Sequence, residues 1–379
     1  MRFFVSKIKY FSLLAVVAAG LVGCNAGGDT GRLSLSLTDA STDQYQAVYV
    51  TVGEVAVHRA DDPEDTWTVV ATPNVTINLL SLANGVREQL ALADLEPGEY
   101  TQLRLMIGTE YDNGVNILGQ AHPYANYVVD LDDQYQSMKI PSGLQTGVKI
   151  VQGFEINQNQ TTELILDFDA SKSVVAAGRS GKFLLKPTIQ VLETTLAAII
   201  GGTVTKAADQ TAVEGAFVSA QVNDAAAVDP KDKVVVRTST LSNETGAYKL
   251  FISAGAYNLV AYKTGFAPNP VAITVEADTL PTQDFALTAA NTGTVTGGVN
   301  IAGDDNDNFV TLSFRQTVNI GGTDVMIEVA SMNVADGGTY TIDLPAGSYV
   351  LVSSSVGLTT QEANVTVTAG ATTTLDLTF

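Results

Sequence analysis

The C-terminal half of this 379-residue chain repeats itself, and the length of the repeat restricts what that half can fold into. Gly-Ala-Tyr at 246–248 recurs as Gly-Thr-Tyr at 338–340, 92 positions later (340 − 248 = 92). Gly-Ala-Tyr at 255–257 recurs at the same distance as Gly-Ser-Tyr at 347–349. Solenoid repeats are about 20–50 residues long. A period of 92 therefore indicates two duplicated domains.

Each copy predicts an antiparallel hairpin. Residues 248–252 and 340–344 alternate between apolar and polar side chains, as half-buried strands do. Turns follow at 254–255 and 345–347, where glycine tolerates a positive φ and proline fixes its own. The next strand begins at a tyrosine nine residues after the first. Because neither copy shows a useful helical period, we expect each to form a small β-sandwich with Greek-key connections.

The first copy resembles the carboxypeptidase regulatory-like domain, a prealbumin-like β-sandwich, over residues 199–287. The motifs that carry the resemblance are Gly202-Thr203-Val204, Ala212-Val213-Glu214-Gly215-Ala216-Phe217-Val218, Thr245-Gly246-Ala247-Tyr248, Ala254-Gly255-Ala256-Tyr257 and Gly265-Phe266. The second copy, about 293–379, keeps the part from Tyr340 to Leu358 but lacks the Gly-Ala-x-Val element. We match its opening Gly293 with Gly202, 91 positions earlier (293 − 202 = 91). The resemblance implies a non-catalytic module that acts as a spacer, a stability element or a weak ligand-binding sandwich.

Residues 31–194 predict a further β-rich unit. Leu33 to Leu37 alternates strictly between apolar and polar residues. Further strands are expected at 48–57, 101–107, 148–156, 162–168 and 183–192. We also expect a short helix within 79–92 and a core position for Trp67, the only tryptophan.

Six strings in this unit resemble a family of bacterial lipoprotein domains of unknown function. They are LSLTDAS (35–41), INLLSLANG (77–85), LEPGEYTQLRL (95–105), IPSGLQTGVKI (140–150), LDFDASKSVV (166–175) and FLLKP (183–187). The family usually has proline where Ser41 stands. The resemblance implies a lipoprotein with a β-rich domain, and it implies no activity.

The N-terminus predicts an exported, lipid-anchored protein. Basic residues in the first nine positions precede an apolar stretch at 11–23, which is too short to span a bilayer. Leu-Val-Gly-Cys at 21–24 resembles the bacterial lipobox, which implies a lipid on Cys24 and removal of the preceding peptide. Asn25 follows the cysteine where aspartate favours inner-membrane retention, so the resemblance implies an outer-membrane lipoprotein that faces the periplasm or the medium. The predicted division is a signal peptide at 1–23, a linker at 24–30, and domains at 31–195, 196–288 and 289–379.

Composition excludes several classes of site. A formal net charge of −20, from 40 acidic and 20 basic residues, opposes nucleic acid and anionic membrane surfaces. With the only cysteine, Cys24, carrying lipid, no disulfide, c-type haem, iron–sulfur cluster or thiolate zinc site can form. The two histidines, His58 and His122, are too few for a multi-histidine metal site. We expect His58 at the surface end of a strand and His122 in an exposed polar loop.

Two acidic motifs and one set of tyrosines are candidates for chemistry. Asp167-Phe168-Asp169 after an apolar strand superficially fits an aspartyl-nucleophile phosphatase, but the expected role is pairing with Lys172 or with turn amides. Asp304, Asp305 and Asp307 are weak candidates for a Ca²⁺ site, because an EF-hand would need glycine at Val310 and glutamate at Gln316. The tyrosines could stack against sugar rings, although we expect them to be structural; they are Tyr248, Tyr257, Tyr340 and Tyr349.

Together these features predict an all-β protein of three independent lobes: a β-rich N-terminal domain and two tandem prealbumin-like sandwiches. The preferred function is a non-enzymatic, lipid-anchored cell-envelope module for binding, scaffolding or surface display. A carbohydrate-binding envelope protein is the alternative, and a carboxylate-dependent hydrolase in 31–195 is the third hypothesis. We expect no cofactor beyond a weakly supported Ca²⁺, and no nucleic acid or haem. The membrane would be contacted through the lipid, and a glycan or an envelope protein would be the partner.

Overall fold

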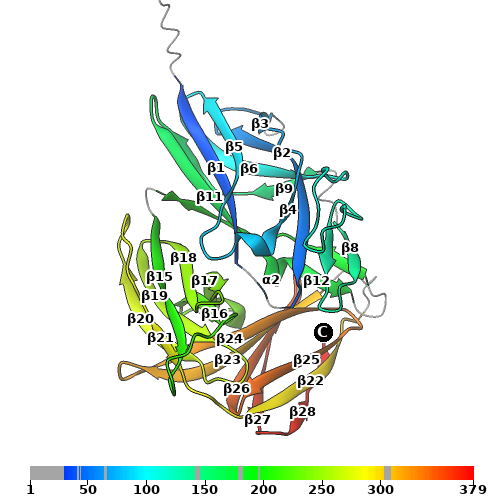
Figure 1. The fold of residues 1–379 in the computed structure, drawn as a ribbon, viewed down its shortest axis with the longest axis vertical. Helices are drawn as coiled ribbons and strands as arrows, with labels where there is room; N and C mark the ends of the chain where they lie inside the picture. The colour runs from blue at the N-terminus through cyan, green and yellow to red at the C-terminus, as the bar shows by residue number, and fades with distance from the viewer. Residues whose placement is uncertain are drawn as a thin grey trace, which may run out of the picture.

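The computed structural model describes residues 30–40, 42, 44–63, 66–140, 146–177, 182–194, 197–302 and 309–379. Their regular secondary structure is almost entirely β-strand, so the predicted all-β class is confirmed. The strands build three lobes in chain order, with the N-terminal lobe at the top of Figure 1 and the C-terminal lobe at the bottom. We call them the N-terminal lobe (30–194), the middle lobe (197–289) and the C-terminal lobe (292–379).

The smaller sheet of the N-terminal lobe has the strand order β14-β11-β1-β5. Its members are β1 (Gly31–Ala40), β5 (Glu88–Leu95), β11 (Thr161–Asp169) and β14 (Ile189–Glu193). β1 runs parallel to β11, with Leu35 opposite Leu164, while β5 and β14 are antiparallel to their neighbours. The alternating leucines of β1 are buried, because every second residue of this strand faces the core.

The larger sheet of this lobe is centred on the long strand β2 (Ala47–Arg59). β2 pairs with β6 (Gly98–Ile107) on one side, and short strands complete the sheet. These are β3 (Thr68–Ala71), β4 (Val75–Asn78), β7 (Tyr127–Val129), β8 (Tyr135–Lys139), β9 (Val148–Ile150), β10 (Phe154–Ile156), β12 (Val174–Ala177) and β13 (Lys182–Leu185). Apolar side chains of both sheets fill one core between them.

The prediction of a short helix within 79–92 is wrong. The chain makes one 3₁₀ turn, η1 (Leu79–Leu82), and then continues as β5. Asn84 and Gly85 both have a positive φ, which a right-handed helix cannot accommodate. The α-helix that the described residues contain in this lobe is α2 (Ala170–Ser173), a single turn after β11.

The middle and C-terminal lobes share one topology. In the first sheet of the middle lobe, β15 (Ala197–Lys206) pairs with antiparallel β18 (Ala247–Ser253) on one side and with parallel β21 (Phe285–Leu287) on the other. The facing sheet has the strand order β17-β16-β19-β20. The facing strands are β16 (Phe217–Asn223), β17 (Val234–Leu241), β19 (Gly255–Tyr262) and β20 (Asn269–Val275). A 3₁₀ turn, η4 (Pro230–Lys233), precedes β17.

The C-terminal lobe repeats each of these pairings with eight strands of its own. Antiparallel β25 and parallel β28 flank β22, and β24, β23, β26 and β27 follow one another in the facing sheet. The bounds are β22 (Thr292–Asn300), β23 (Phe309–Ile320), β24 (Thr323–Ala335), β25 (Thr339–Pro345), β26 (Gly347–Ser354), β27 (Gln361–Val367), β28 (Thr372–Thr374) and β29 (Leu377–Thr378). The duplication predicted from the sequence is therefore a duplication of structure.

Close backbone packing corrects the match between the two openings. Gly202 lies opposite Tyr248, and Gly297, not Gly293, lies opposite Tyr340. The openings therefore correspond at 95 positions (297 − 202 = 95). A Cβ at Gly202 would lie 1.9 Å from the carbonyl oxygen of Gln283, and a Cβ at Gly297 would meet a carbonyl oxygen at 1.8 Å. Glycine is required at both places because the backbone of another segment lies directly against it.

The three lobes are not independent, contrary to expectation. A parallel bridge between Ala176 of β12 and Val334 of β24 joins the larger N-terminal sheet to the C-terminal lobe. The middle and C-terminal lobes exchange two hydrogen bonds: the Gln221 amide donates to the Glu328 carbonyl at 2.7 Å, and the Glu328 N–H donates to Gln221 Oε1 at 2.8 Å. Polar groups buried in this way fix the position of one lobe against the next.

Arg315 of β23 is the most highly connected of these groups. It is 2 % exposed, and its guanidinium donates to the carbonyl oxygens of Pro230, Lys231 and Val234 in the middle lobe at 2.7–3.2 Å. Its Nε donates to Ser313 Oγ, whose hydroxyl in turn donates to Glu328. Burial lowers the pKa of Arg315, opposed by the nearby Glu328 carboxylate.

Replacing Arg315 by methionine should destabilise the protein by roughly 3–5 kcal/mol, because three carbonyls lose their donor and the nearby Glu328 carboxylate loses a favourable positive charge. Urea unfolding followed by circular dichroism measures the change. The matched control is Arg32→Met, which removes an exposed pair with Asp94 and should leave the unfolding midpoint unchanged. Equal midpoints for both variants would show that the Arg315 contacts do not hold the lobes together.

Candidate functional site

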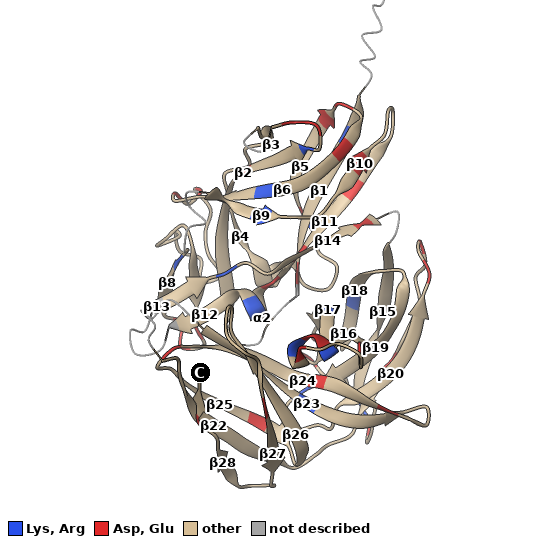
Figure 2. Ribbon diagram, turned by 180° about the vertical axis from the view of Figure 1, so that it is seen from behind, with Lys and Arg blue, Asp and Glu red and all other residues tan. Residues whose placement is uncertain are grey.

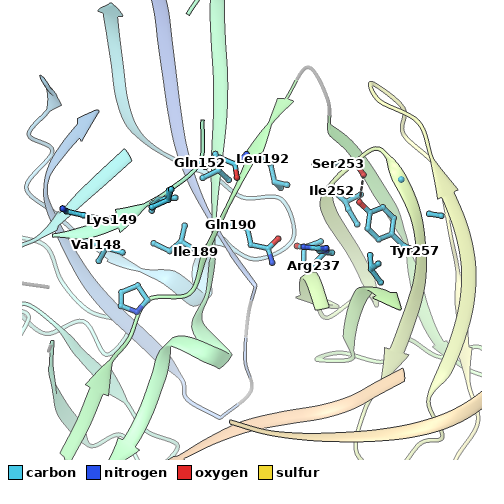
Figure 3. A pocket seen from close by; sticks show the side chains of 18 residues that line it. Val148, Lys149, Gln152, Ile189, Gln190, Leu192, Arg237, Ile252, Ser253 and Tyr257 are labelled. Atoms are coloured by element: carbon cyan, nitrogen blue, oxygen red, sulfur yellow. Dashed lines mark hydrogen bonds between the residues drawn. The ribbon is translucent and has the colours of Figure 1, made fainter. Parts of the chain in front are cut away.

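A cleft of about 670 Å³ lies between the N-terminal and middle lobes (Figure 3). Its N-terminal wall consists of β9 and β14, and each of these strands lies at the edge of its sheet. Its middle-lobe wall includes parts of β17 and β18, which are also edge strands, and the start of β19. The two lobes touch beside the cleft, where the Asn84 N–H donates to Thr240 Oγ1 at 3.0 Å and the Arg87 guanidinium lies over the Phe251 ring.

Arg237 enters this cleft from a β-bulge. In the β16–β17 ladder Ala220 pairs with Thr238 and Gln221 pairs with Val236, so Arg237 is the extra residue. An extra residue bends its strand and redirects its side chain, and bulges are frequent beside functional sites. Arg237 is exposed and takes part in no ion pair with any described residue.

Amide and hydroxyl groups accompany Arg237. Gln190 of β14 and Arg237 extend toward each other from opposite sides of the cleft, and Gln152 lies above them (Figure 3). None of the described residues lining the cleft is Asp or Glu. Lys149 belongs to β9, but its ammonium turns away from the centre of the cleft and lies 5.8 Å from the Trp67 ring.

Tyr257 forms part of the middle-lobe wall. Its hydroxyl donates to the Ser253 carbonyl at 3.0 Å, which leaves the half-buried ring fixed beside the cleft. Burial raises the pKa of this phenol, opposed by the charge of Arg237. The arrangement of a guanidinium, carboxamides and an aromatic ring can bind a polar ligand that carries negative charge.

The other tyrosines of the repeat are buried, so the four do not form a sugar-stacking platform. Tyr248, Tyr340 and Tyr349 are each 2 % exposed, and their hydroxyls donate to the carbonyls of Gln283, Leu375 and Pro345. The expectation that these tyrosines are structural is confirmed. Only Tyr257 of the set reaches the cleft.

Asp167 and Asp169 lie behind the cleft, at the junction with the middle lobe. Asp169 accepts a hydrogen bond from the Lys172 N–H as the cap of α2, and it pairs with the Lys172 ammonium at 3.0 Å, as expected from the sequence. Asp167 is 4 % exposed and accepts a hydrogen bond from Thr238. β11 and β1 are parallel, but among the described residues no layer of helices covers these strands. The described residues also contain no cluster of side chains that could hold a metal ion.

A second buried carboxyl group, Asp39, lies close to this pair. It is 3 % exposed; its Oδ1 accepts the Ala170 N–H, and its Oδ2 has no hydrogen-bond partner among the described residues. Burial raises the pKa of Asp39 well above its usual value. Burial also raises the pKa of Asp167 to about 7, against the opposing hydrogen bond from Thr238.

Both histidines are buried, which corrects their predicted surface positions. His58 is 5 % exposed although it lies near the end of β2, because Thr101 of β6 and Pro63 of the loop after β2 cover its ring nitrogens. His122 is 3 % exposed and lies 2.8 Å from the Tyr127 hydroxyl. Burial lowers its pKa, with an opposing contribution from Asp112. Both rings therefore stabilise the N-terminal lobe.

Trp67 is not in the core, contrary to expectation. It is half-buried on the outer face of the larger sheet, and the Arg104 guanidinium lies 4.3 Å from its ring. The alternation of apolar and polar residues around Trp67 indicates a strand, but it does not indicate which face of the sheet is covered by other segments.

Cys24 lies outside the described residues, as do the Ca²⁺ candidates Asp304, Asp305 and Asp307. No helix in the described part of the chain is long and apolar enough to cross a bilayer. Arg237 and Gln190 were not predicted from the sequence. The repeat contains a signal for Arg237, because the equivalent position in the second copy is the apolar Val329 (237 + 92 = 329).

The buried carboxyl groups predict a pH dependence of stability. Because the folded protein keeps the proton of Asp167 up to about pH 7 and the unfolded chain releases it near pH 4, the free energy of unfolding should fall as pH rises between these values, by up to about 4 kcal/mol. Asp167→Asn should flatten this slope, and Asp39→Asn should remove a second part of it. Urea unfolding at half-unit pH steps measures both. Parallel profiles for wild type and Asp167→Asn would contradict the assignment.

Two family models match the chain. Residues 30–187 match a domain of unknown function (DUF4382), and residues 199–288 match the carboxypeptidase regulatory-like domain. A comparison with curated proteins finds no match.

Several solved structures align with the chain at low similarity. The Bacillus anthracis TIE protein is 13% identical with a TM-score of 0.20; the alignment covers 93% of this chain and 50% of that one, so the chain spans half its length. A streptococcal ancillary pilin is 8% identical (TM-score 0.20, covering 92% and 98%). The shaft pilin SpaA of Lactobacillus rhamnosus GG is 11% identical (TM-score 0.20, covering 49% and 97%). Similarity at this level carries no argument. The family matches show that the chain contains a DUF4382 domain followed by a carboxypeptidase regulatory-like domain.

Proposed function

We propose that this chain is a non-enzymatic, lipid-anchored protein of the cell envelope that acts as a rigid binding and scaffold module. One observation carries the proposal: buried hydrogen bonds lock the middle and C-terminal lobes together and a β-bridge joins the N-terminal lobe to the C-terminal lobe, while a polar cleft stays open between the N-terminal and middle lobes. Fixed lobes with an open cleft suit a module that presents one preformed surface to a partner.

The position of the predicted anchor agrees with this role. β1 begins at Gly31, seven residues after Cys24 (31 − 24 = 7). A fully extended chain of seven residues spans at most about 25 Å. β1 begins at the end of the N-terminal lobe that lies farthest from the C-terminal lobe in Figure 1. A lipid on Cys24 would place the N-terminal lobe next to the membrane and the C-terminal lobe away from it. An outer-membrane destination is part of the same proposal.

Carbohydrate binding is the second candidate function, and the cleft favours it. Carboxamides can both donate and accept, so Gln152 and Gln190 suit sugar hydroxyl groups, and Tyr257 offers a ring to a sugar face.

Anchoring is tested by replacing Cys24 with alanine. Wild-type protein from a Gram-negative-type host should partition into the detergent phase of Triton X-114, and Cys24→Ala should move to the aqueous phase because it cannot carry lipid. Asn25→Ala is the control and should still partition with detergent. An aqueous wild-type protein would contradict the anchor.

Binding without turnover is tested with the full chain on a glycan array and against phosphatase and glycosidase substrates. We expect saturable binding to at least one glycan and no turnover. Turnover that Asp167→Ala or Asp169→Ala abolishes would instead establish the hydrolase hypothesis.

A further inference from the structure

The charge of the cleft runs against the charge of the whole protein. The chain has a formal net charge of −20, and Asp and Glu positions are distributed over the strands and loops of all three lobes (Figure 2). The cleft nevertheless has an exposed arginine and no acidic residue among its described lining. Among the residues that the structure describes, Arg237 has no acidic partner, although acidic groups outnumber basic ones by two to one in the sequence.

Arg237 is directed into the cleft by an irregularity that both copies of the repeat keep. In the C-terminal lobe Phe314 pairs with Ala330 and Arg315 with Glu328, so Val329 is the extra residue at the equivalent bulge. Val329 is 1 % exposed and packs in a core that includes Val260 of the middle lobe. The same bulge therefore holds a buried apolar residue in one copy and an exposed cation in the other. Packing explains Val329, whereas it does not require Arg237.

The neighbours of Arg237 suit a carboxylate better than a bare phosphate or a neutral ligand. A guanidinium is planar and binds a carboxylate through two parallel hydrogen bonds. Gln190 faces it across the cleft and can hydrogen-bond hydroxyl groups beside that carboxylate. The Tyr257 ring, held by Ser253, adds an apolar wall. Asp167, opposite Gln190 in the β11–β14 ladder, is uncharged below about pH 7 and does not compete for the guanidinium there.

A saccharide fits the walls better than a peptide strand. A peptide that extends a sheet needs a continuous free edge, but β9 has three residues and β14 has five. The longer edge strands β17 and β18 each contribute only two residues to the cleft, Arg237 with Thr238 and Ile252 with Ser253. A cleft of about 670 Å³ lies within the usual range for small ligands, about 300–1,000 Å³.

We propose that the cleft between the N-terminal and middle lobes binds an acidic saccharide, with Arg237 holding a uronic-acid carboxylate and Gln190 a neighbouring hydroxyl. This inference rests on the proposed binding function and names its ligand class. Arg237 is a binding residue in this assignment, and no bond of the ligand is made or broken.

Isothermal titration calorimetry of the full chain in detergent at pH 6 tests the inference with trigalacturonate, its neutral methyl ester and triglutamate. Trigalacturonate should bind, and the ester at least tenfold more weakly. Arg237→Gln should lose roughly 10- to 100-fold in affinity for trigalacturonate, because a charge-assisted hydrogen-bond pair disappears. Arg237→Lys should fall between, since it keeps the charge without the planar fork. Gln190→Ala should weaken binding several-fold.

Arg104→Gln is the matched control, because it removes another arginine without an acidic partner among the described residues, one that lies on Trp67 and outside the cleft. It should leave affinity unchanged, and unchanged thermal midpoints for all variants show that the fold is intact. Equal affinity for acid and ester, tighter binding of triglutamate, or full affinity in Arg237→Gln would each overturn the acidic-saccharide site. If a neutral glycan from the array binds wild type and Arg237→Gln equally, the inference fails while the binding function stands; if nothing binds in either assay, both fail.

Discussion

Polar groups buried between the lobes must find their partners in the neighbouring lobe, and this requirement fixes the shape of the molecule. The Gln221 amide and the Glu328 backbone satisfy each other in both directions. The buried Arg315 guanidinium donates to three carbonyls of the middle lobe. A tilt of one lobe would leave these groups unpaired, at a cost of about 1–3 kcal/mol for each neutral group. The relative position of the middle and C-terminal lobes is therefore specified by hydrogen-bond geometry rather than by apolar contact alone.

The contact between the N-terminal and middle lobes is different, and the cleft is its consequence. A small apolar cluster of Ile165, Leu192 and Phe251 and the Asn84–Thr240 hydrogen bond hold these lobes together. The edges of the sheets do not pair across the remaining space. The cleft thus arises where four strand edges approach without merging into one sheet.

Patterns along one strand could be read from the sequence, whereas relations between distant strands could not. Alternation correctly located β1, β18 and β25, because a half-buried strand has a period of two. The same alternation could not show that His58 and His122 are covered, because the covering residues come from other segments. The match of Gly293 with Gly202 failed for a related reason: Gly-Thr-Val looks alike at both places, but the register of the pairing strands places Gly297 opposite Tyr340, as Gly202 lies opposite Tyr248.

The site was harder to predict than the fold. A bulge depends on the register of two strands, and one sequence does not contain that register. Comparison of the two copies gives the missing clue in Arg237 and Val329, once their strands are superimposed.

The bulge that the two sandwiches share makes one position of each sandwich tolerant of change. An extra residue in a strand makes no ladder pair of its own, so its side chain can change while the pairs on either side keep their register. In the C-terminal sandwich the extra residue, Val329, is buried at the interface with the middle lobe, and in the middle sandwich the extra residue, Arg237, is exposed in the cleft. A single replacement at position 237 therefore changes the chemistry of the cleft wall while the ladder pairs on either side keep their register.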